Sequence, residues 1–228
     1  MRYYFSLILP LLLFSCMANG ENRPGFVCGK FNGNVIEVPA NYVFPFAEYE
    51  GYSYFDPKFI KNKKGCEANF NVLPLRMTWP EMNPIGSKEN NKEIKVSIEP
   101  LDGEAKGYLE SERYIRLDRG EEKTKGNVLY DEKLDLYFSE VKLKKMNKYI
   151  DPEKHKSGYY WRVENNKLTA LFNCLWIPRD KKYERCDVIF LIPEYKIRVN
   201  VTLNIDDLII WDEMKSNITN FIYQYIKK

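Results

Sequence analysis

The chain has few of the residues and motifs that mark enzymes. Its single histidine, His155, stands in the charged run Asp-Pro-Glu-Lys-His-Lys, which is typical of an exposed loop. One histidine cannot build a multi-histidine metal centre. The chain contains no G-x-S-x-G, P-loop or G-x-G-x-x-G motif and no C-x-x-C pair. We therefore expect no catalytic residue, no cofactor and no metal site.

The chain also lacks a strong excess of charge of one sign. Thirty-five Lys and Arg residues face 32 Asp and Glu residues, which gives a net charge of +3. That value is too small to predict a nucleic-acid partner, and the charges alternate in sign. Two lysine-rich runs, residues 61–64 and 142–148, are most simply solvated loops or sheet edges.

Long apolar runs are scarce as well. The run from Phe5 to Phe14 follows the basic Arg2 and is about ten residues long, which suits a signal peptide and is too short to span a bilayer. Leu13-Phe14-Ser15-Cys16 resembles the bacterial lipobox, in which the cysteine is acylated and the chain is cut before it. We expect a signal peptide over residues 1–15 and a lipid on Cys16.

Residues 16–25 then form a polar, lipid-anchored tether that reaches at most about 30 Å. Met17 stands where an aspartate would favour the inner membrane of enteric bacteria, so the resemblance implies a periplasmic protein held on the outer membrane. A second processing site, Ala18-Asn19-Gly20, leaves a secreted soluble protein as the alternative.

Four cysteines remain after Cys16, and an even number in an exported chain predicts two disulfides. These cysteines fall into an early and a late pair. Of the three possible pairings we expect Cys28–Cys66 and Cys174–Cys186.

Residues 159–204 alternate between apolar and polar side chains, which predicts an antiparallel meander. Asn165-Asn166 suits a tight turn because Asn tolerates positive φ angles. A hairpin closed there places Trp161 opposite Ala170.

The next two turns of the meander set the rest of the register. A turn about Asp180 places Cys174 opposite Cys186, and a turn at Pro193-Glu194 pairs Ile192 with Tyr195. The resulting single buried face holds Trp161, Phe172, Cys174, Cys186, Phe190 and Val199.

A C-terminal amphipathic helix is expected to cover that face. Asn204 or Asp206 can cap it, and its apolar residues recur at three- and four-residue steps. They are Trp211, Met214, Ile218, Phe221, Ile222 and Tyr225.

The N-terminal half is less regular. Its candidate strands are residues 35–38, 42–46, 73–79, 94–98, 114–117 and 134–141. The predicted fold class is α+β, a mainly antiparallel sheet with the C-terminal helix packed on it. We expect residues 26–228 to form a single globular domain, with two lobes dividing near 145–158 as the alternative.

Residues 35–82 interleave aromatic residues, prolines and charges without clean periodicity. One interpretation is an irregular core segment stapled through Cys66. The other is a rigid recognition surface, since Tyr, Trp and Arg dominate interface hot spots. On the second interpretation the candidate partner-binding residues are Tyr42, Phe44, Tyr49, Tyr52 and Trp79.

The phrases VIEVPANYVFPFAEYEG and LPLRMTWPEM, with the Cys16 lipobox, resemble small lipoproteins encoded beside type VI secretion effectors, which act as immunity proteins. This resemblance implies a periplasmic binder that neutralises a protein toxin, such as one acting on phospholipid or cell wall. Two alternatives stay open: a structural or assembly lipoprotein of the envelope, and a hydrolase using Glu48 and Glu50.

Overall fold

The computed structural model describes residues 22–86, 92–119, 123–143, 151 and 154–227. The expected signal peptide, Cys16 and most of the tether lie outside these residues, as does much of the segment where a division into two lobes was considered. Within the described ranges no helix is long and apolar enough to cross a membrane.

The described part of the chain is mostly strands with two α-helices. The strands are β1 (Phe26–Phe31), β2 (Asn34–Pro39), β3 (Glu48–Tyr49), β4 (Phe70–Trp79), β5 (Lys92–Pro100), β6 (Lys123–Lys125), β7 (Leu129–Asp131), β8 (Leu136–Leu143), β9 (Lys156–Glu164), β10 (Lys167–Ile177), β11 (Lys182–Ile192) and β12 (Ile197–Asn204). The helices are α1 (Tyr108–Leu117), α2 (Trp211–Tyr225) and the short 3-10 turns η1 (Ala40–Tyr42), η2 (Pro57–Lys61), η3 (Pro193–Tyr195) and η4 (Ile205–Ile210).

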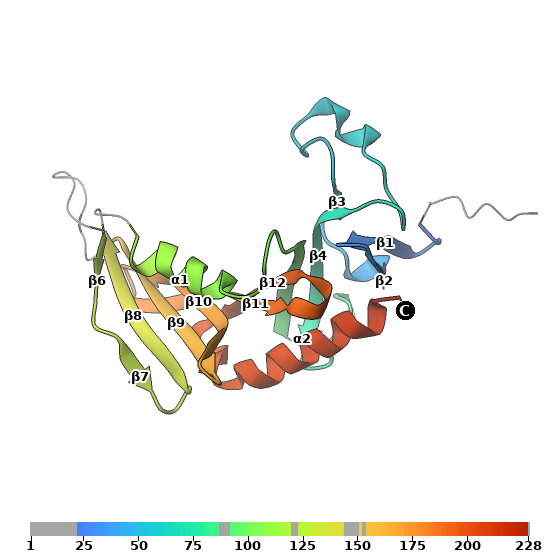
Figure 1. Ribbon diagram of the computed structural model, residues 1–228. Coiled ribbons are helices and arrows are strands. Elements are labelled where there is room, and N and C mark those ends of the chain that lie inside the picture. Colours follow the sequence, from blue (N-terminus) through green and yellow to red (C-terminus); the bar gives the residue numbers. More distant parts are fainter. Residues whose placement is uncertain (1–21, 87–91, 120–122, 144–150, 152–153, 228) are drawn as a thin grey trace, which may run out of the picture.

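One antiparallel sheet of ten strands organises the molecule, in the order β3-β4-β5-β12-β11-β10-β9-β8-β6, with β7 also paired to β8. β1 and β2 form a separate hairpin. The helices α1 and α2 lie on opposite sides of the large sheet (Figure 1). The α+β class with a mainly antiparallel sheet is therefore confirmed.

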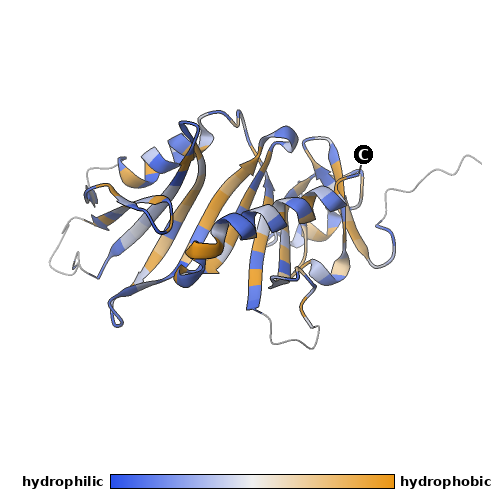
Figure 2. Cartoon of the chain, turned by 90° about the horizontal axis from the view of Figure 1, so that it is seen from below, coloured by the Kyte–Doolittle hydropathy of each residue, from blue (hydrophilic) through white to orange (hydrophobic). Residues whose placement is uncertain are grey.

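The C-terminal helix packs on the sheet as expected. Figure 2 shows α2 lying across the strands, and its apolar residues from Trp211 to Ile222 are buried. The Trp211 ring lies 5.0 Å from the ring of Phe172 and 5.7 Å from that of Phe190. The helical segment made of η4 and α2 begins at Asn204, which forms a capping box with Asp207 at the start of η4.

The hairpin of β9 and β10 follows the predicted turn but departs from the predicted register. Asn165 and Asn166 have φ angles of +50° and +59°, as the tight turn requires. A bulge between Leu168 and Ala170 then shifts the pairing, so that Trp161 lies opposite Leu171. The prediction that Trp161 lies on the main buried face is wrong, because the extra residue reverses which side chains share a face.

That shift gives the meander a second buried face, where only one was predicted. Trp161 and Leu171 pack with Leu117, Val141 and Tyr159 in a cluster separate from the main core. Helix α1 supplies Leu117 to this cluster. The predicted strand over 114–117 is therefore wrong: its aromatic and β-branched residues form the last turn of a helix that is buried through its leucines.

The last turn of the meander also differs from its prediction. η3 occupies Pro193–Tyr195, so Ile192 pairs with Ile197 and not with Tyr195. Because the slip is two residues, the inward face of β12 is unchanged. Residues 197–203 alternate between buried and half-buried side chains, as the sequence predicted.

In the N-terminal half, the strands expected over 35–38, 73–79 and 94–98 lie within β2, β4 and β5, and the strand expected over 134–141 corresponds to β8. The expected strand over 42–46 is wrong. Pro39 and Pro45 lack backbone donors, and the segment forms η1 and an irregular stretch.

Both expected disulfides are present. Cys174 and Cys186 lie directly opposite each other in β10 and β11, with their Cα atoms 4.0 Å apart. Cys28 in β1 is bonded to Cys66, at a Cα separation of 4.7 Å.

Candidate partner-binding surfaces

The five candidate partner-binding residues do not share one surface. Phe44 and Tyr52 are 55% and 44% exposed, whereas Tyr42, Tyr49 and Trp79 are 9%, 3% and 9% exposed. The prediction is therefore wrong for the three buried residues, because their side chains are not accessible to a partner.

Two of the buried aromatics have clear structural contacts. The Tyr42 ring packs 4.9 Å from the ring of Phe221 in α2, and the Tyr49 hydroxyl donates a hydrogen bond to the Cys28 carbonyl at 2.8 Å. Burial raises the pKa of both tyrosines. The interleaved aromatic residues marked residues 35–82 as an unusual segment. Composition alone did not predict which of these aromatic side chains are buried and which are exposed.

A groove crosses the face of the sheet that carries α1, and we call it the open-face groove. Its floor is made of outward residues from neighbouring strands. Backbone pairing aligns one row of the floor as Asn173, Asp187, Thr202, Lys95 and Arg76.

The groove has two hollows that meet at Asn200. The hollow near α1 has a volume of about 230 Å³ and is bordered by Arg116. The hollow near β4 has a volume of about 310 Å³ and is bordered by Phe44 and Arg76. Together the two hollows lie over β10, β11, β12, β5 and β4.

The lip at β4 combines an exposed aromatic ring with a fixed charge. The Arg76 guanidinium lies 4.2 Å from the Phe44 ring centroid and donates two hydrogen bonds to Glu93, at 2.8 and 2.6 Å. These bonds lower the pKa of the Glu93 carboxyl. The arrangement holds the lip ready for contact, which reduces the entropy lost on binding.

A polar network links the first residue of α1 to the sheet beside the groove. Arg198 donates to the Tyr108 hydroxyl at 2.7 Å and pairs with Glu99, which also accepts from Asn200 at 2.8 Å. Burial acts to lower the pKa of Arg198, but the bonds to Tyr108 and Glu99 raise it, and the net shift is upward. Asn200 is the member of this network that borders both hollows, and its hydrogen bond to Glu99 orients its side-chain amide there.

A second surface is the loop of residues 52–64, which we call the 52–64 loop. It projects from the body above β3 (Figure 1). The Asn62 side chain exchanges two hydrogen bonds of 2.8 Å with the backbone of Tyr52 and so closes the loop at its base. Gly51 has a φ of +128°, and a Cβ there would lie 2.5 Å from Asn62 Oδ1, which favours glycine at this position.

Aromatic packing stiffens the interior of this loop. The Tyr54 ring lies 4.9 Å from that of Phe46 and 5.6 Å from that of Phe59. The Asp56 side chain accepts from the backbone N–H of Lys58 at 2.8 Å and caps η2. Just beyond the loop, a disulfide to β1 fixes its base.

The 52–64 loop exposes both large apolar side chains, which form its tip, and lysines. Phe55 is 92% exposed and Ile60 is 80% exposed. The loop also carries four exposed lysines: Lys58, Lys61, Lys63 and Lys64. The lysine-rich run 61–64 was visible in the sequence, but its place beside exposed apolar side chains was not.

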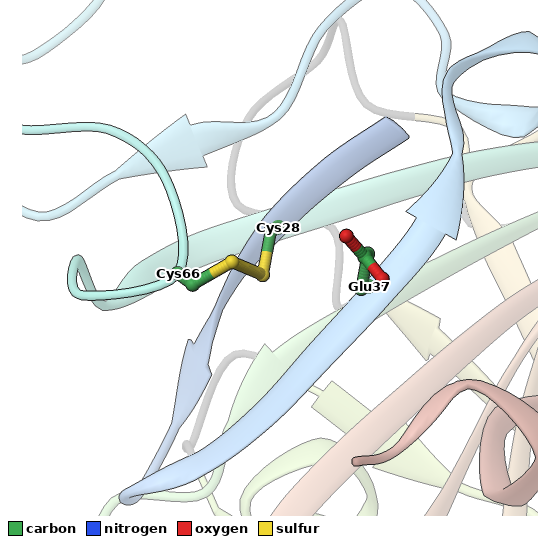
Figure 3. A group of neighbouring side chains, drawn as sticks. All are labelled: Cys28, Glu37 and Cys66. Carbon is green, nitrogen blue, oxygen red and sulfur yellow. A yellow bond between two sulfur atoms is a disulfide. The ribbon is translucent and has the colours of Figure 1, made fainter. Parts of the chain in front are cut away.

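Figure 3 shows a group of potential metal ligands: Cys28, Cys66 and Glu37, within 4.8 Å of one another. The two sulfurs are bonded to each other, so neither is a thiolate. The Glu37 carboxylate pairs with Arg23 at 3.3 Å and with Lys227 at 2.5 Å. In the oxidised protein these residues are structural.

Two of the residues considered for catalysis lie on the surface. His155 is exposed, as expected. Glu50, one of the two carboxylates considered for hydrolysis, is exposed and accepts a hydrogen bond from Asn69 at 2.9 Å.

No protein-family model and no curated protein sequence matches the chain. A solved structure does match: Smlt3025, an immunity protein of the Stenotrophomonas maltophilia type IV secretion system. The match covers 90% of this chain and 94% of that chain, with a TM-score of 0.55 and 16% sequence identity. The chain thus shares its fold with a secretion-system immunity protein.

Proposed function

We propose that this protein is an immunity protein that neutralises a secreted protein toxin by binding it. The observation that carries the proposal is the fold, which matches a solved immunity protein over almost the whole of both chains. The sequence resemblance to immunity lipoproteins supports the same function. The type VI system stays a prediction, because the structural neighbour belongs to a type IV system.

We further propose that the toxin docks in the open-face groove. The groove is concave, so it suits a convex element of a partner. It offers Phe44 and Arg76 as anchors at one lip and side-chain amides on its floor. Aromatic and arginine side chains at the centre of an interface supply much of its binding energy.

The place of action that we propose is the periplasm, with the chain held by a lipid on Cys16 to the outer membrane. The two disulfides support an oxidising compartment. Cleavage after Gly20 and release as a soluble protein is the alternative, which mass spectrometry of the mature N-terminus distinguishes.

The test is to express the toxin encoded beside this gene in the periplasm, with and without this protein. We expect growth to be restored and the two proteins to co-purify. No protection and no complex would refute the immunity function. Co-purification with an endogenous envelope complex in place of the toxin would favour the structural lipoprotein.

The groove is tested with two variants and one control. Phe44→Asp removes the lip anchor, and Asn200→Arg fills the junction of the two hollows. Each should weaken toxin binding by about thirtyfold or more, the effect of losing a hot spot. Leu129→Asp, at an exposed apolar residue on β7, should leave affinity unchanged. Unchanged affinity in both groove variants would place the toxin elsewhere.

A further inference from the structure

The 52–64 loop combines exposed apolar side chains with lysines, and the proposed binding of the toxin at the groove uses none of these residues. We propose that this loop seats on an anionic phospholipid surface, with Phe55 and Ile60 in the interface and the lysines beside the headgroups. This is a second binding function, and it requires neither the toxin nor the lipid at Cys16.

Charge is the first argument. The loop holds four lysines and one aspartate, a net charge of +3, which equals the net charge of the whole chain. The rest of the chain is balanced, with 31 basic and 31 acidic residues (35 less 4, and 32 less 1). The loop is one of two lysine-rich runs of the chain: residues 142–148 hold four more lysines and no acidic residue, but most of that run lies outside the described residues.

Within the part of the chain that the structure describes, some lysines form ion pairs and others do not. Lys30, Lys92 and Lys125 each form an ion pair with a carboxylate. Within the described ranges, no ion pair joins the four lysines of the loop to a carboxylate. Lys58 and Lys64 instead lie over the rings of Tyr52 and Phe59, with the ammonium nitrogens 5.4 and 6.0 Å from the ring centroids. An exposed lysine near an anionic bilayer favours binding.

The apolar side chains of the tip are the second argument. Phe55 and Ile60 are the most exposed large hydrophobic residues of the described chain, and Tyr52 and Tyr54 beside them are about half exposed. Aromatic residues with neighbouring lysines are the composition found at membrane interfaces. Exposed apolar side chains gathered in one place mark an interaction surface.

Internal packing keeps the tip in this arrangement. The rings of Tyr54, Phe46 and Phe59 pack against one another beneath the tip. Phe55 contacts this group only edge-on, 5.5 Å from the Tyr54 ring. The loop therefore presents its apolar residues without a conformational change.

The position of the N-terminal segment is the third argument. The Asn22 side chain accepts a hydrogen bond from the Cys28 backbone N–H at 2.9 Å, and Cys28 is bonded to Cys66 at the base of the loop. The described N-terminal segment and the loop lie at the same end of the molecule (Figure 1). The chain from Cys16 to Asn22 spans at most about 20 Å, so a lipid on Cys16 would hold this end close to the bilayer.

An acidic cleft on a protein partner is the competing occupant. The observations favour lipid because the cations are all lysines, point charges on flexible stems that need no fixed geometry at the partner. A carboxylate cleft would instead favour arginine, whose planar fork donates two hydrogen bonds to one carboxylate.

The experiment is vesicle co-sedimentation of the exported chain carrying Cys16→Ser, so that no acyl group contributes. Vesicles of phosphatidylcholine are compared with vesicles containing about 30% phosphatidylglycerol, which supplies an anionic surface. We expect binding only to the anionic vesicles, falling as salt increases. Equal binding to both, or binding to neither, would overturn the proposal.

Two loop variants locate the contact. Lys58→Gln with Lys61→Gln should reduce partitioning by about fivefold for each lysine, and Phe55→Ser with Ile60→Ser by about tenfold or more. Thermal unfolding checks that every variant is folded. The matched control is a pair of exposed apolar residues on another surface, and its substitution should have no effect: Val128→Ser with Leu129→Ser.

The outcomes separate this proposal from the proposed function. Loss of vesicle binding with unchanged toxin affinity in the loop variants supports the lipid contact. Unchanged vesicle binding in the loop variants overturns it, and loss of toxin affinity in the same variants would then assign the loop to the protein partner. Failure of the immunity test leaves the vesicle result standing.

Discussion

Removal of the Cys28–Cys66 disulfide should free the 52–64 loop before it unfolds the protein. This bond joins residues 38 apart in the sequence, and the Cys174–Cys186 bond joins residues 12 apart. In the chain-entropy treatment, the first contributes about 4 kcal/mol to the free energy of unfolding and the second about 3 kcal/mol. Losses of this size are a large fraction of the stability of a typical domain, but smaller than the whole.

The local effect is what distinguishes the two bonds. Cys66 lies just beyond the loop, whereas Cys174 and Cys186 are fully buried in the central sheet. The loop contains exposed lysines at 58, 61, 63 and 64, which are sites for trypsin. In the paired variant Cys28→Ala with Cys66→Ala, we expect cleavage in residues 58–64 to accelerate well before global unfolding.

The assay is limited trypsin digestion under native conditions, read by mass spectrometry, with urea unfolding measured on the same samples. The paired variant Cys174→Ala with Cys186→Ala is the matched control, since it loses stability without touching the loop. If loop cleavage is no faster in the Cys28 and Cys66 variant than in this control, the disulfide does not hold the loop and the reasoning fails.

Two further predictions concern the sheet. Trp211→Ala should lower the free energy of unfolding by about 3–5 kcal/mol, because it empties the space beside the rings of Phe172 and Phe190. Trp211→Phe should lower it clearly less. Equal losses of the two variants in urea unfolding would contradict the packing argument. Burial acts to raise the pKa of Glu140, but hydrogen bonds from Tyr183 and Lys156 outweigh burial, and the net shift of this pKa is downward. The contribution of Glu140 to the free energy of unfolding is therefore present above pH about 4.5. It is lost as the pH falls through the lower pKa of the folded protein. Glu140→Gln should therefore remove part of the acid-dependent fall in the urea midpoint below about pH 4.5, and an unchanged pH profile would refute this role.

The sequence predicted the parts of the fold that depend on local pattern. Alternation over β12 and the spacing of apolar residues in α2 are set by which side chains must be buried, and both predictions are confirmed. The bulge beside Thr169 was not predictable in this way, because one extra residue in a strand leaves the composition unchanged. It nevertheless moved Trp161 to the other face and gave α1 a cluster to cover.

The candidate surfaces were harder still to predict from the sequence. The floor of the groove joins Arg76, Thr202 and Asn173, which come from distant parts of the sequence and meet only through strand pairing. Outward residues such as Thr202 were predicted to face away from the core, but nothing in β12 alone predicts a concavity. Aromatic residues in 35–82 divided between core and surface for the same reason, since burial is decided by neighbours that are remote in sequence.

The two proposed surfaces are connected along the chain through β4 but differ in chemistry. β4 carries Arg76 at the lip of the groove, and its first residue, Phe70, follows the base of the 52–64 loop by only a few positions. If the toxin docks at the groove and lipid at the loop as proposed, the two contacts use different side chains, and affinity for the toxin and for vesicles is expected to change independently under substitution. Loop variants that lose vesicle binding and keep toxin affinity, together with groove variants that do the reverse, would therefore establish both proposals at once.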